Sequence, residues 1–296
     1  MSSDIDIYTE HFGLRERPFN LVPDPAFLYW GPAHKRAYAI LEYGIMTRAP
    51  ITLLTGEVGA GKTTLLQHLL RSIREEVRVG LISNAHGNPN ELLRWVLHAL
   101  DQPSEADQSY IDLFSQFEAF LLEEYAAGRR VVLIFDEAQN LGRAALEELR
   151  MYTNINSGKD ELLQLILVGQ PELREIVRRP DMTQFAQRVA SGFHLSAMTE
   201  EVVAKYIGHR VALAGGTEDL FSPGACRAIY EATGGVPRLV NQLCDLSLVY
   251  AFTSEDSLVT AATVQDVLGD GVFFGGGLSA EPLRVVNPDK RTSTTH

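Results

Sequence analysis

The sequence has little of three things: cysteine, long apolar runs and basic residues. Its two cysteines, Cys226 and Cys244, fall in segments predicted to be helical, with no metal-ligand spacing around them. This pattern excludes a disulfide framework and favours two buried side chains in a reducing compartment. No apolar run approaches the ~20 residues that a membrane-spanning helix needs, and the acidic, polar N-terminus is unlike a signal peptide. We therefore expect a cytoplasmic protein without direct membrane insertion.

Basic residues are outnumbered by acidic ones, with 26 Lys and Arg against 38 Asp and Glu, and the formal net charge is −12. This balance disfavours a nucleic-acid surface spread over the whole molecule, although an oligomer could still gather arginines in a pore. The 296 residues are 45% hydrophobic, which is enough for a sizeable core and about two domains.

What the sequence does have is a complete phosphate-binding loop of the form G-x-x-x-x-G-K-[ST]. An apolar run at 51–55 predicts a strand before it, and helical spacing at 65–71 predicts a helix after it. Backbone N–H groups of such a loop point at phosphate oxygens, Lys62 reaches the β- and γ-phosphates, and Thr63 can ligate Mg²⁺. The alternative is a glycine-rich turn that binds nothing, which the flanking elements disfavour. The residues predicted to bind the nucleotide are Gly56, Glu57, Val58, Gly59, Ala60, Gly61, Lys62, Thr63 and Thr64.

A second motif follows the apolar run at 131–135, where Asp136 and Glu137 form a Walker B element. Because ligands bind at the carboxyl ends of parallel strands, we expect Asp136 to hold Mg²⁺ through water. Glu137 is the predicted catalytic group that polarises the attacking water. The alternative is a surface Asp-Glu pair after a strand, which the phosphate loop makes less attractive.

Strands alternate with helices as far as Met198, and beyond it only helical patterns occur. This order predicts an α/β phosphate-loop core with a parallel sheet, followed by a small all-helical lid. Strands are predicted at 51–55, 77–83, 131–136, 162–169 and 192–195. Helices are predicted at 33–48, 65–71, 90–100, 111–126, 144–152, 172–179 and 181–188, and in the lid at 199–214, 222–233, 236–252 and 263–268.

These patterns divide the chain into an aromatic and proline-rich arm at 1–32, a core at 33–198, a lid at 199–268 and a disordered tail at 269–296. Aromatic residues alternate with prolines in the arm, which favours an extended, turn-rich segment. The arm could wall an adenine pocket, or it could simply pack on the molecule as hydrophobic cover. The sequence leaves these two interpretations open.

Taken together, these segments resemble an AAA+ ATPase with a five-stranded sheet, and more narrowly the ExeA/GspA family of general-secretion-pathway ATPases. The resemblance covers about residues 7–268 and rests on several motifs as a set. They are Tyr8-Thr9-Glu10-His11-Phe12-Gly13-Leu14 with Pro18-Phe19 and Pro23-Asp24-Pro25, residues 55–64, Asp136-Glu137-Ala138-Gln139-Asn140-Leu141, residues 167–173, Ala186-Gln187-Arg188 and Gly234-Gly235-Val236-Pro237-Arg238.

The resemblance implies roles for further residues and a place for the second nucleotide-binding strand. The strands at 51–55 and 131–136 would be separated in space by a strand that comes later in the chain. Gln170 would sense the γ-phosphate, Arg238 would reach it from the lid, and Arg188 would be an arginine finger given to the neighbouring subunit. The alternative for Arg188 is an intradomain salt bridge, with Arg178 and Arg179 as rival fingers.

Two functions from different classes follow from the resemblance. In the first, ATP and Mg²⁺ bind at subunit junctions of a ring or filament, and hydrolysis drives or switches a secretion or exopolysaccharide assembly system through a protein partner. Long family members continue into a membrane span and a peptidoglycan-binding region that this sequence lacks. In the second, the protein is an ATP-dependent DNA-binding regulator of transposition. The acidic composition favours the first, and the helical lid disfavours a third alternative, a metabolic kinase.

Overall fold

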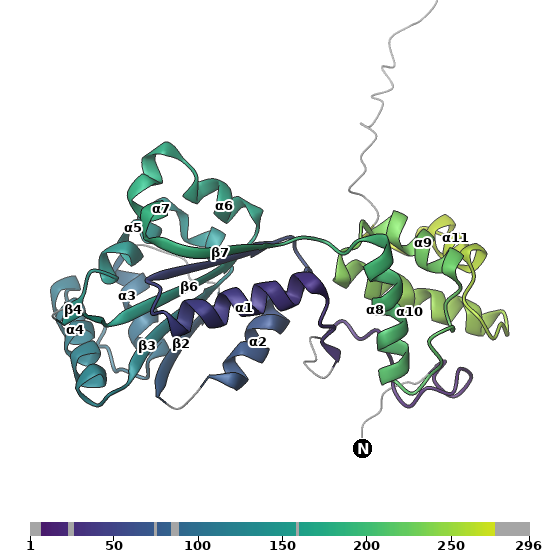
Figure 1. The fold of residues 1–296 in the computed structure, drawn as a ribbon, viewed down its shortest axis with the longest axis horizontal. Coiled ribbons are helices and arrows are strands. Elements are labelled where there is room, and N and C mark those ends of the chain that lie inside the picture. Colours follow the sequence, from purple (N-terminus) through teal and green to yellow (C-terminus); the bar gives the residue numbers. More distant parts are fainter. Residues whose placement is uncertain (1–6, 23–26, 74–75, 84–88, 158–159, 276–296) are drawn as a thin grey trace, which may run out of the picture.

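The computed structural model describes residues 7–22, 27–73, 76–83, 89–157 and 160–275, and shows two lobes joined side by side (Figure 1). The first lobe contains α1 (Pro32–Met46), β1 (Ile51–Gly56), α2 (Lys62–Ser72), β2 (Val77–Ser83), α3 (Pro89–Ala99), α4 (Tyr110–Ala126), β3 (Arg130–Asp136), η2 (Ala138–Leu141), α5 (Gly142–Tyr152), β4 (Asn156–Ser157), β5 (Asp160–Glu161), β6 (Leu163–Gly169), α6 (Pro171–Val177), η3 (Pro180–Met182), α7 (Thr183–Arg188) and β7 (Val189–Leu195). The second lobe, the lid, contains α8 (Glu200–Leu213), α9 (Pro223–Thr233), α10 (Pro237–Thr253) and α11 (Ala261–Gly269).

The main sheet has five parallel strands in the order β2-β3-β6-β1-β7, which confirms the predicted fold class. Strand β6 lies between β1 and β3, as the resemblance implied, and pairs with both. Because all five strands run the same way, the ends of β1, β6 and β3 meet at one edge of the sheet. This edge carries the phosphate loop, Gln170 and the Asp136-Glu137 pair.

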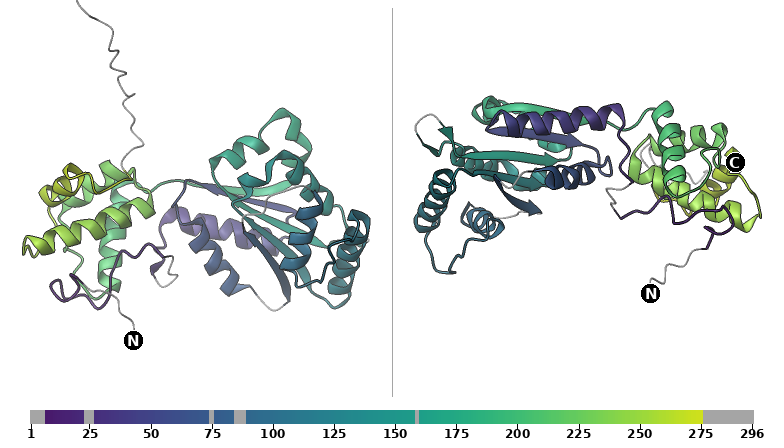
Figure 2. Two further views of the ribbon diagram at one scale, coloured as in Figure 1. Left: turned by 180° about the vertical axis from the view of Figure 1, so that it is seen from behind. Right: turned by 60° about the horizontal axis from the view of Figure 1, so that its bottom comes forward.

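Both faces of the sheet are covered, which explains why its central strands are mostly apolar. In β3, Val132 and Ile134 pack with α1 and α2, whereas Leu133 and Phe135 pack with α3 to α7 on the opposite face. The two views of Figure 2 show these helix layers on either side of the sheet. The packing fixes the strand ends, and therefore the site at that edge.

The lid has its own hydrophobic core, and the N-terminal arm is part of it. Tyr8, Leu14, Phe19 and Phe27 are buried together with residues of α8 to α11. The arm therefore packs mainly on the lid, whereas Trp30 near its end packs against Tyr38 of α1 and His68 of α2 in the first lobe. Its later residues also line a cavity described below. Phe273 also packs into the lid core, beyond α11. The predicted tail lies outside the described residues from residue 276 onward.

Several element boundaries differ from the sequence-based predictions. Strand β7 begins at Val189 rather than at residue 192, because the chain already pairs there with Ile51 of β1 before an irregularity in register. The segment predicted as one helix at 181–188 is divided into η3 and α7. The antiparallel β4–β5 pair was missed because two-residue strands carry no periodicity.

Candidate nucleotide-binding site

The phosphate loop closes on its own lysine. Gly59 and Gly61 adopt left-handed backbone angles, with φ of +79° and +93°, and Lys62 then begins α2. The Lys62 ammonium is buried and donates to the carbonyl oxygens of Gly56 at 2.7 Å and Glu57 at 2.9 Å. Burial lowers the pKa of Lys62, although the nearby carboxylates of Glu137 and Asp136 oppose this shift. The loop thus holds a cation beside the N-terminus of a helix, an arrangement suited to an anion.

The imidazole ring of His34, in α1, contacts the backbone of this loop. Its Nε2 lies 3.2 Å from the carbonyl oxygen of Ala60. A carbonyl oxygen can only accept, so Nε2 carries the hydrogen. Burial lowers the pKa of His34, and the bond to Ala60 only partly opposes this, which favours the neutral ring. A Cβ at Gly61 would lie 3.0 Å from the same nitrogen, so the glycine also makes room for the histidine.

Asp136 ends β3 beside the start of α2. The Thr63 hydroxyl donates to Asp136 Oδ2 at 3.2 Å, so the two predicted Mg²⁺ ligands are already in contact. Burial raises the pKa of Asp136, and the charge of Glu137 adds to this, while the hydrogen bonds that Asp136 accepts and the charge of Lys62 oppose it. A divalent cation placed here would reverse that effect, because it favours the ionised carboxylate.

Glu137 lies next to this pair, with its backbone in the left-handed region at φ +56°. Its Oε2 accepts one hydrogen bond from Gln139 Nε2 at 2.6 Å and another from Gln170 Nε2 at 3.0 Å. Burial raises the pKa of Glu137, but the two amide donors and the charge of Lys62 outweigh this and leave it lowered. The carboxylate is therefore held in its charged form.

The lid meets the loop directly at the N-terminus of α10. The backbone N–H of Arg238 donates to the Gly59 carbonyl at 3.2 Å. A Cβ added to Gly59 would lie 2.5 Å from Arg238 Cβ, so only glycine allows this approach. Within the described part of the chain, the Arg238 guanidinium makes no hydrogen bond or ion pair, and it borders the cavity. A lid cation is thus placed next to the phosphate loop.

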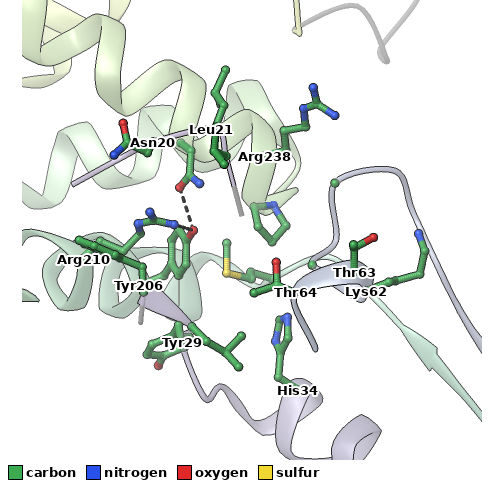
Figure 3. A pocket seen from close by; sticks show the side chains of 18 of the residues that line it. Asn20, Leu21, Tyr29, His34, Lys62, Thr63, Thr64, Tyr206, Arg210 and Arg238 are labelled. Carbon is green, nitrogen blue, oxygen red and sulfur yellow. Dashed lines mark hydrogen bonds between the residues drawn. The ribbon is translucent and has the colours of Figure 1, made fainter. Parts of the chain in front are cut away.

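A cavity of about 540 Å³ lies between the two lobes at this point (Figure 3). Figure 3 shows Lys62 and Thr63 at one end and Tyr206 and Arg210 at the other. Its lining residues come from the arm, α1, the phosphate loop with the start of α2, the end of β3 and the lid: Asn20, Leu21, Val22, Phe27, Leu28, Tyr29, His34, Val58, Gly59, Gly61, Lys62, Thr63, Thr64, Glu137, Met198, Tyr206, Arg210, Pro237, Arg238 and Asn241. This volume falls within the usual range for a small-molecule site.

A polar network closes the end of the cavity far from Lys62. Arg210 donates to the Tyr206 hydroxyl at 2.8 Å, and that hydroxyl donates to Asn241 Oδ1 at 2.8 Å. Arg210 also donates to the carbonyl of Pro18 at 2.6 Å and lies over the ring of Phe27. The lid and the arm therefore build this wall together.

Part of this chain matches a known protein family, and a protein of known name is similar to most of it. Residues 45–177 match a protein family described as AAA domain. The chain carries an AAA domain. It is also 38% identical over 246 residues to General secretion pathway protein A of Aeromonas hydrophila, an alignment covering 83% of this chain. That alignment spans 45% of the relative, so the chain corresponds to about half of its length. The resemblance expected from the sequence is confirmed.

Solved structures share the fold of the AAA domain and lid. They include Cdc6p from Pyrobaculum aerophilum, with a TM-score of 0.65 and 18% identity, covering 86% of this chain and 72% of that one. Another is Drosophila ORC bound to DNA, with a TM-score of 0.66 and 16% identity, covering 92% of this chain and 68% of that one. At such identities the likeness concerns the fold alone.

A magnesium ion would find oxygen ligands in the AAA domain. Thr63 and Asp136 present a hydroxyl and a carboxylate, the oxygen ligands that Mg²⁺ uses. Among the described residues, no group of three or more His, Cys, Asp and Glu side chains could hold a metal. The residues therefore fit an ion that takes its remaining ligands from water and phosphate, and not a metal caged by protein alone.

The predicted arginine finger lies away from the cavity of the AAA domain. Arg188, at the end of α7, pairs with Glu161 at 3.4 Å and also donates to Asn154. This is the intradomain contact that we weighed as the alternative. Arg179 pairs with Asp181, whereas the exposed Arg178 has no side-chain partner among the described residues.

The structure thus brings together Lys62 and Thr63 of α2, Asp136 and Glu137 at the end of β3, Gln170 after β6 and Arg238 of α10, while Arg188 stands apart. Sequence reasoning missed His34, Gln139, Tyr206, Arg210 and Asn241. Gln139 lies in the motif at 136–141, in which the resemblance implied roles only for Asp136 and Glu137. The other four had no local signal, because each has a partner at the site that is distant in sequence.

Proposed function

We propose that this chain binds ATP with Mg²⁺ in the cavity between its lobes and hydrolyses it. The observation that carries the proposal is that a buried lysine, Glu137 and a lid arginine line one cavity, with Asp136 bonded to Thr63 of its lining. The AAA domain supports the same activity.

In the proposed reaction, Lys62 exchanges its bonds to the Gly56 and Glu57 carbonyls for phosphate oxygens, which bind the ammonium more strongly because they are charged. The N-terminus of α2 faces the same anion. Mg²⁺ bound near Thr63 and Asp136 would neutralise charge developing on the transferred phosphoryl group. Glu137 polarises the attacking water, and Arg238 adds positive charge from the lid.

We further propose that ATP sits at junctions between copies of this chain, and that turnover drives or switches a secretion or envelope assembly system. The similarity to General secretion pathway protein A supports the secretion role. None of the helices in the described residues is long and apolar enough to cross a membrane. We propose that contact with the assembly system is made through a protein partner.

The hydrolysis proposal is tested by separating binding from turnover. Lys62→Ala should weaken binding of a fluorescent ATP analogue at least about tenfold, because the loop then holds phosphate without its cation. Glu137→Gln should keep that affinity and lose turnover by about 10²- to 10⁴-fold, because an amide is no base. Lys205→Ala, which removes an exposed lysine of α8, is the matched control. Wild-type affinity in Lys62→Ala would contradict the site assignment.

The secretion role needs a cellular test. Cells lacking this protein should retain an exported product, and wild-type protein but not Lys62→Ala should restore export. If the Lys62→Ala protein restores export fully, ATP binding is not part of the role. DNA co-sedimentation with ATP at two salt concentrations addresses the transposition alternative, since phosphate contacts impose a steep salt dependence.

A further inference from the structure

Gln139 connects the two parts of the site that respond to a γ-phosphate in the proposed reaction. It lies in η2, the short turn that follows the Asp136-Glu137 pair. Its Nε2 donates to Glu137 Oε2 at 2.6 Å, and its Oε1 accepts the backbone N–H of Gln170 at 3.0 Å. One side chain therefore bridges the end of β3 and the end of β6.

The orientation of this amide is fixed by its partners. The backbone N–H of Gln170 can only donate, so it must face the oxygen of Gln139. The ionised carboxylate of Glu137 can only accept, so it must face the nitrogen. Each end of the amide has a single partner that suits it, and a rotated amide would lose both bonds.

The surrounding residues leave room for this bridge and depend on it. A Cβ at Gly169 would lie 2.8 Å from Gln139 Oε1, so the glycine before Gln170 allows the amide to approach. Glu137 adopts a left-handed backbone at φ +56°, a conformation uncommon outside glycine. Strain of this kind persists where surrounding contacts enforce it.

We propose that Gln139 is a positioning residue for ATP hydrolysis, which aims the Glu137 carboxylate into the cavity; this rests on the hydrolysis proposed above. Both amide donors occupy Oε2 of Glu137 and leave Oε1 for the attacking water. The Gln170 amide would donate either to Glu137, as it does here, or to the γ-phosphate that it senses. Its bond to Glu137 can therefore be given up when the nucleotide binds. The bond from Gln139 stays in place when Gln170 turns away, and it keeps the base oriented during the reaction.

Two substitutions of similar length separate the two bonds of Gln139. Gln139→Met loses both, whereas Gln139→Glu keeps an acceptor for the Gln170 N–H but places a carboxylate against Glu137. Both variants should lose about 10- to 100-fold in kcat, as expected for a hydrogen bond to a charged group. Their affinity for a fluorescent ATP analogue should stay within about twofold of wild type, since neither touches the phosphate loop.

Wild-type kcat in Gln139→Glu would overturn the proposal, because it would mean that Gln139 only supports the Gln170 backbone. A loss of ATP affinity parallel to the loss of kcat would also overturn it. Gln265→Ala, at an exposed glutamine of α11, is the control for a general effect of removing an amide and should match wild type in both measurements.

A double-mutant cycle identifies the residue through which Gln139 acts. In a Glu137→Gln background, Gln139→Met should reduce the residual rate no further, because the group that it positions is already gone. An undiminished further loss would assign Gln139 a role independent of Glu137 and overturn the proposal. Wild-type protein that binds ATP without turnover would instead overturn the hydrolysis proposal itself, so the two failures are distinguishable.

Discussion

At the scale of single residues, Gly59 combines two demands in one position. Its φ of +79° favours glycine. A Cβ added at this position would lie 2.5 Å from Arg238 Cβ, so the lack of a Cβ is what lets Arg238 approach. Gly59→Ala should therefore displace the N-terminus of α10 from the loop. Nucleotide affinity should fall at least about tenfold, as measured with a fluorescent ATP analogue, because the lid cation moves away from the phosphates.

The matched control is Gly128→Ala, where φ is +76° and nothing lies within 4 Å of the added Cβ. Both variants carry the same backbone penalty of about 1–2 kcal/mol, which thermal unfolding measures. Only Gly59→Ala should also expose the lid to protease. Equal ATP affinity in the two variants would mean that the contact between the loop and Arg238 has no role in binding.

The residues of the site could be predicted from the sequence where they belong to a short motif, and not elsewhere. Lys62, Thr63, Asp136 and Glu137 belong to motifs in which a few adjacent positions carry the chemistry. His34 and Arg210 act through backbone carbonyls of residues far along the chain, Ala60 and Pro18. A carbonyl is present at every position, so no pattern of residue types marks such a contact.

At the scale of elements, the arm is fastened to α10 by a charged cluster. Asp245 accepts hydrogen bonds from the buried Tyr8 hydroxyl and from the Arg17 guanidinium. Asp245→Ala should lower the free energy of unfolding of the lid by about 1–3 kcal/mol, because a half-buried donor pair loses its charged acceptor. Thermal unfolding is the measurement, and Asp219→Ala, at an exposed aspartate, is the control.

The same substitution should loosen the arm before the rest of the lid. Hydrogen exchange of arm residues 7–19 should then rise more than exchange in α9, which packs against α8, α10 and α11. Uniform exchange across the lid would mean that the arm and the helices open as a single unit. Unchanged exchange in the arm would contradict the role assigned to Asp245.

Regular elements were predicted well, and their exceptions have physical causes. The buried strand at 163–169 and the helix at 223–233 follow from apolar runs bounded by glycine and proline. The partner of the arm was not predictable from the sequence. Its aromatic residues indicate that the segment is buried against another surface, but they do not indicate which surface. The extension of β7 to Val189 depends on pairing with β1, which is a tertiary contact.

At the scale of the whole molecule, the remaining prediction concerns the partner subunit. We keep Arg188 as the proposed finger, although in the single chain it pairs with Glu161 at 3.4 Å. Arg188→Ala should lose about 10³- to 10⁵-fold in turnover. Glu137→Gln should lose about 10²- to 10⁴-fold. Mixing the two variants should restore activity, because some junctions then join an intact Glu137 to an intact Arg188.

The mixing experiment has an internal comparison in Arg178→Ala. Suppose that activity recovers when Arg178→Ala is mixed with Glu137→Gln, but not when Arg188→Ala is mixed with Glu137→Gln. The exposed Arg178 would then be the arginine finger. Absence of recovery in both mixtures, once light scattering shows that the subunits co-assemble, would mean that each site is completed within one chain.

The lid is built from both ends of the sequence, and this sets the order in which the protein can fold during synthesis. Tyr8 bonds to a residue 237 positions later, so during synthesis the arm waits for its partner until α10 has been made. The AAA domain between them has all its strands by Leu195 and can fold first. Until α10 emerges, Phe19 and its apolar neighbours stay exposed, and this interval is when the nascent chain most needs a chaperone.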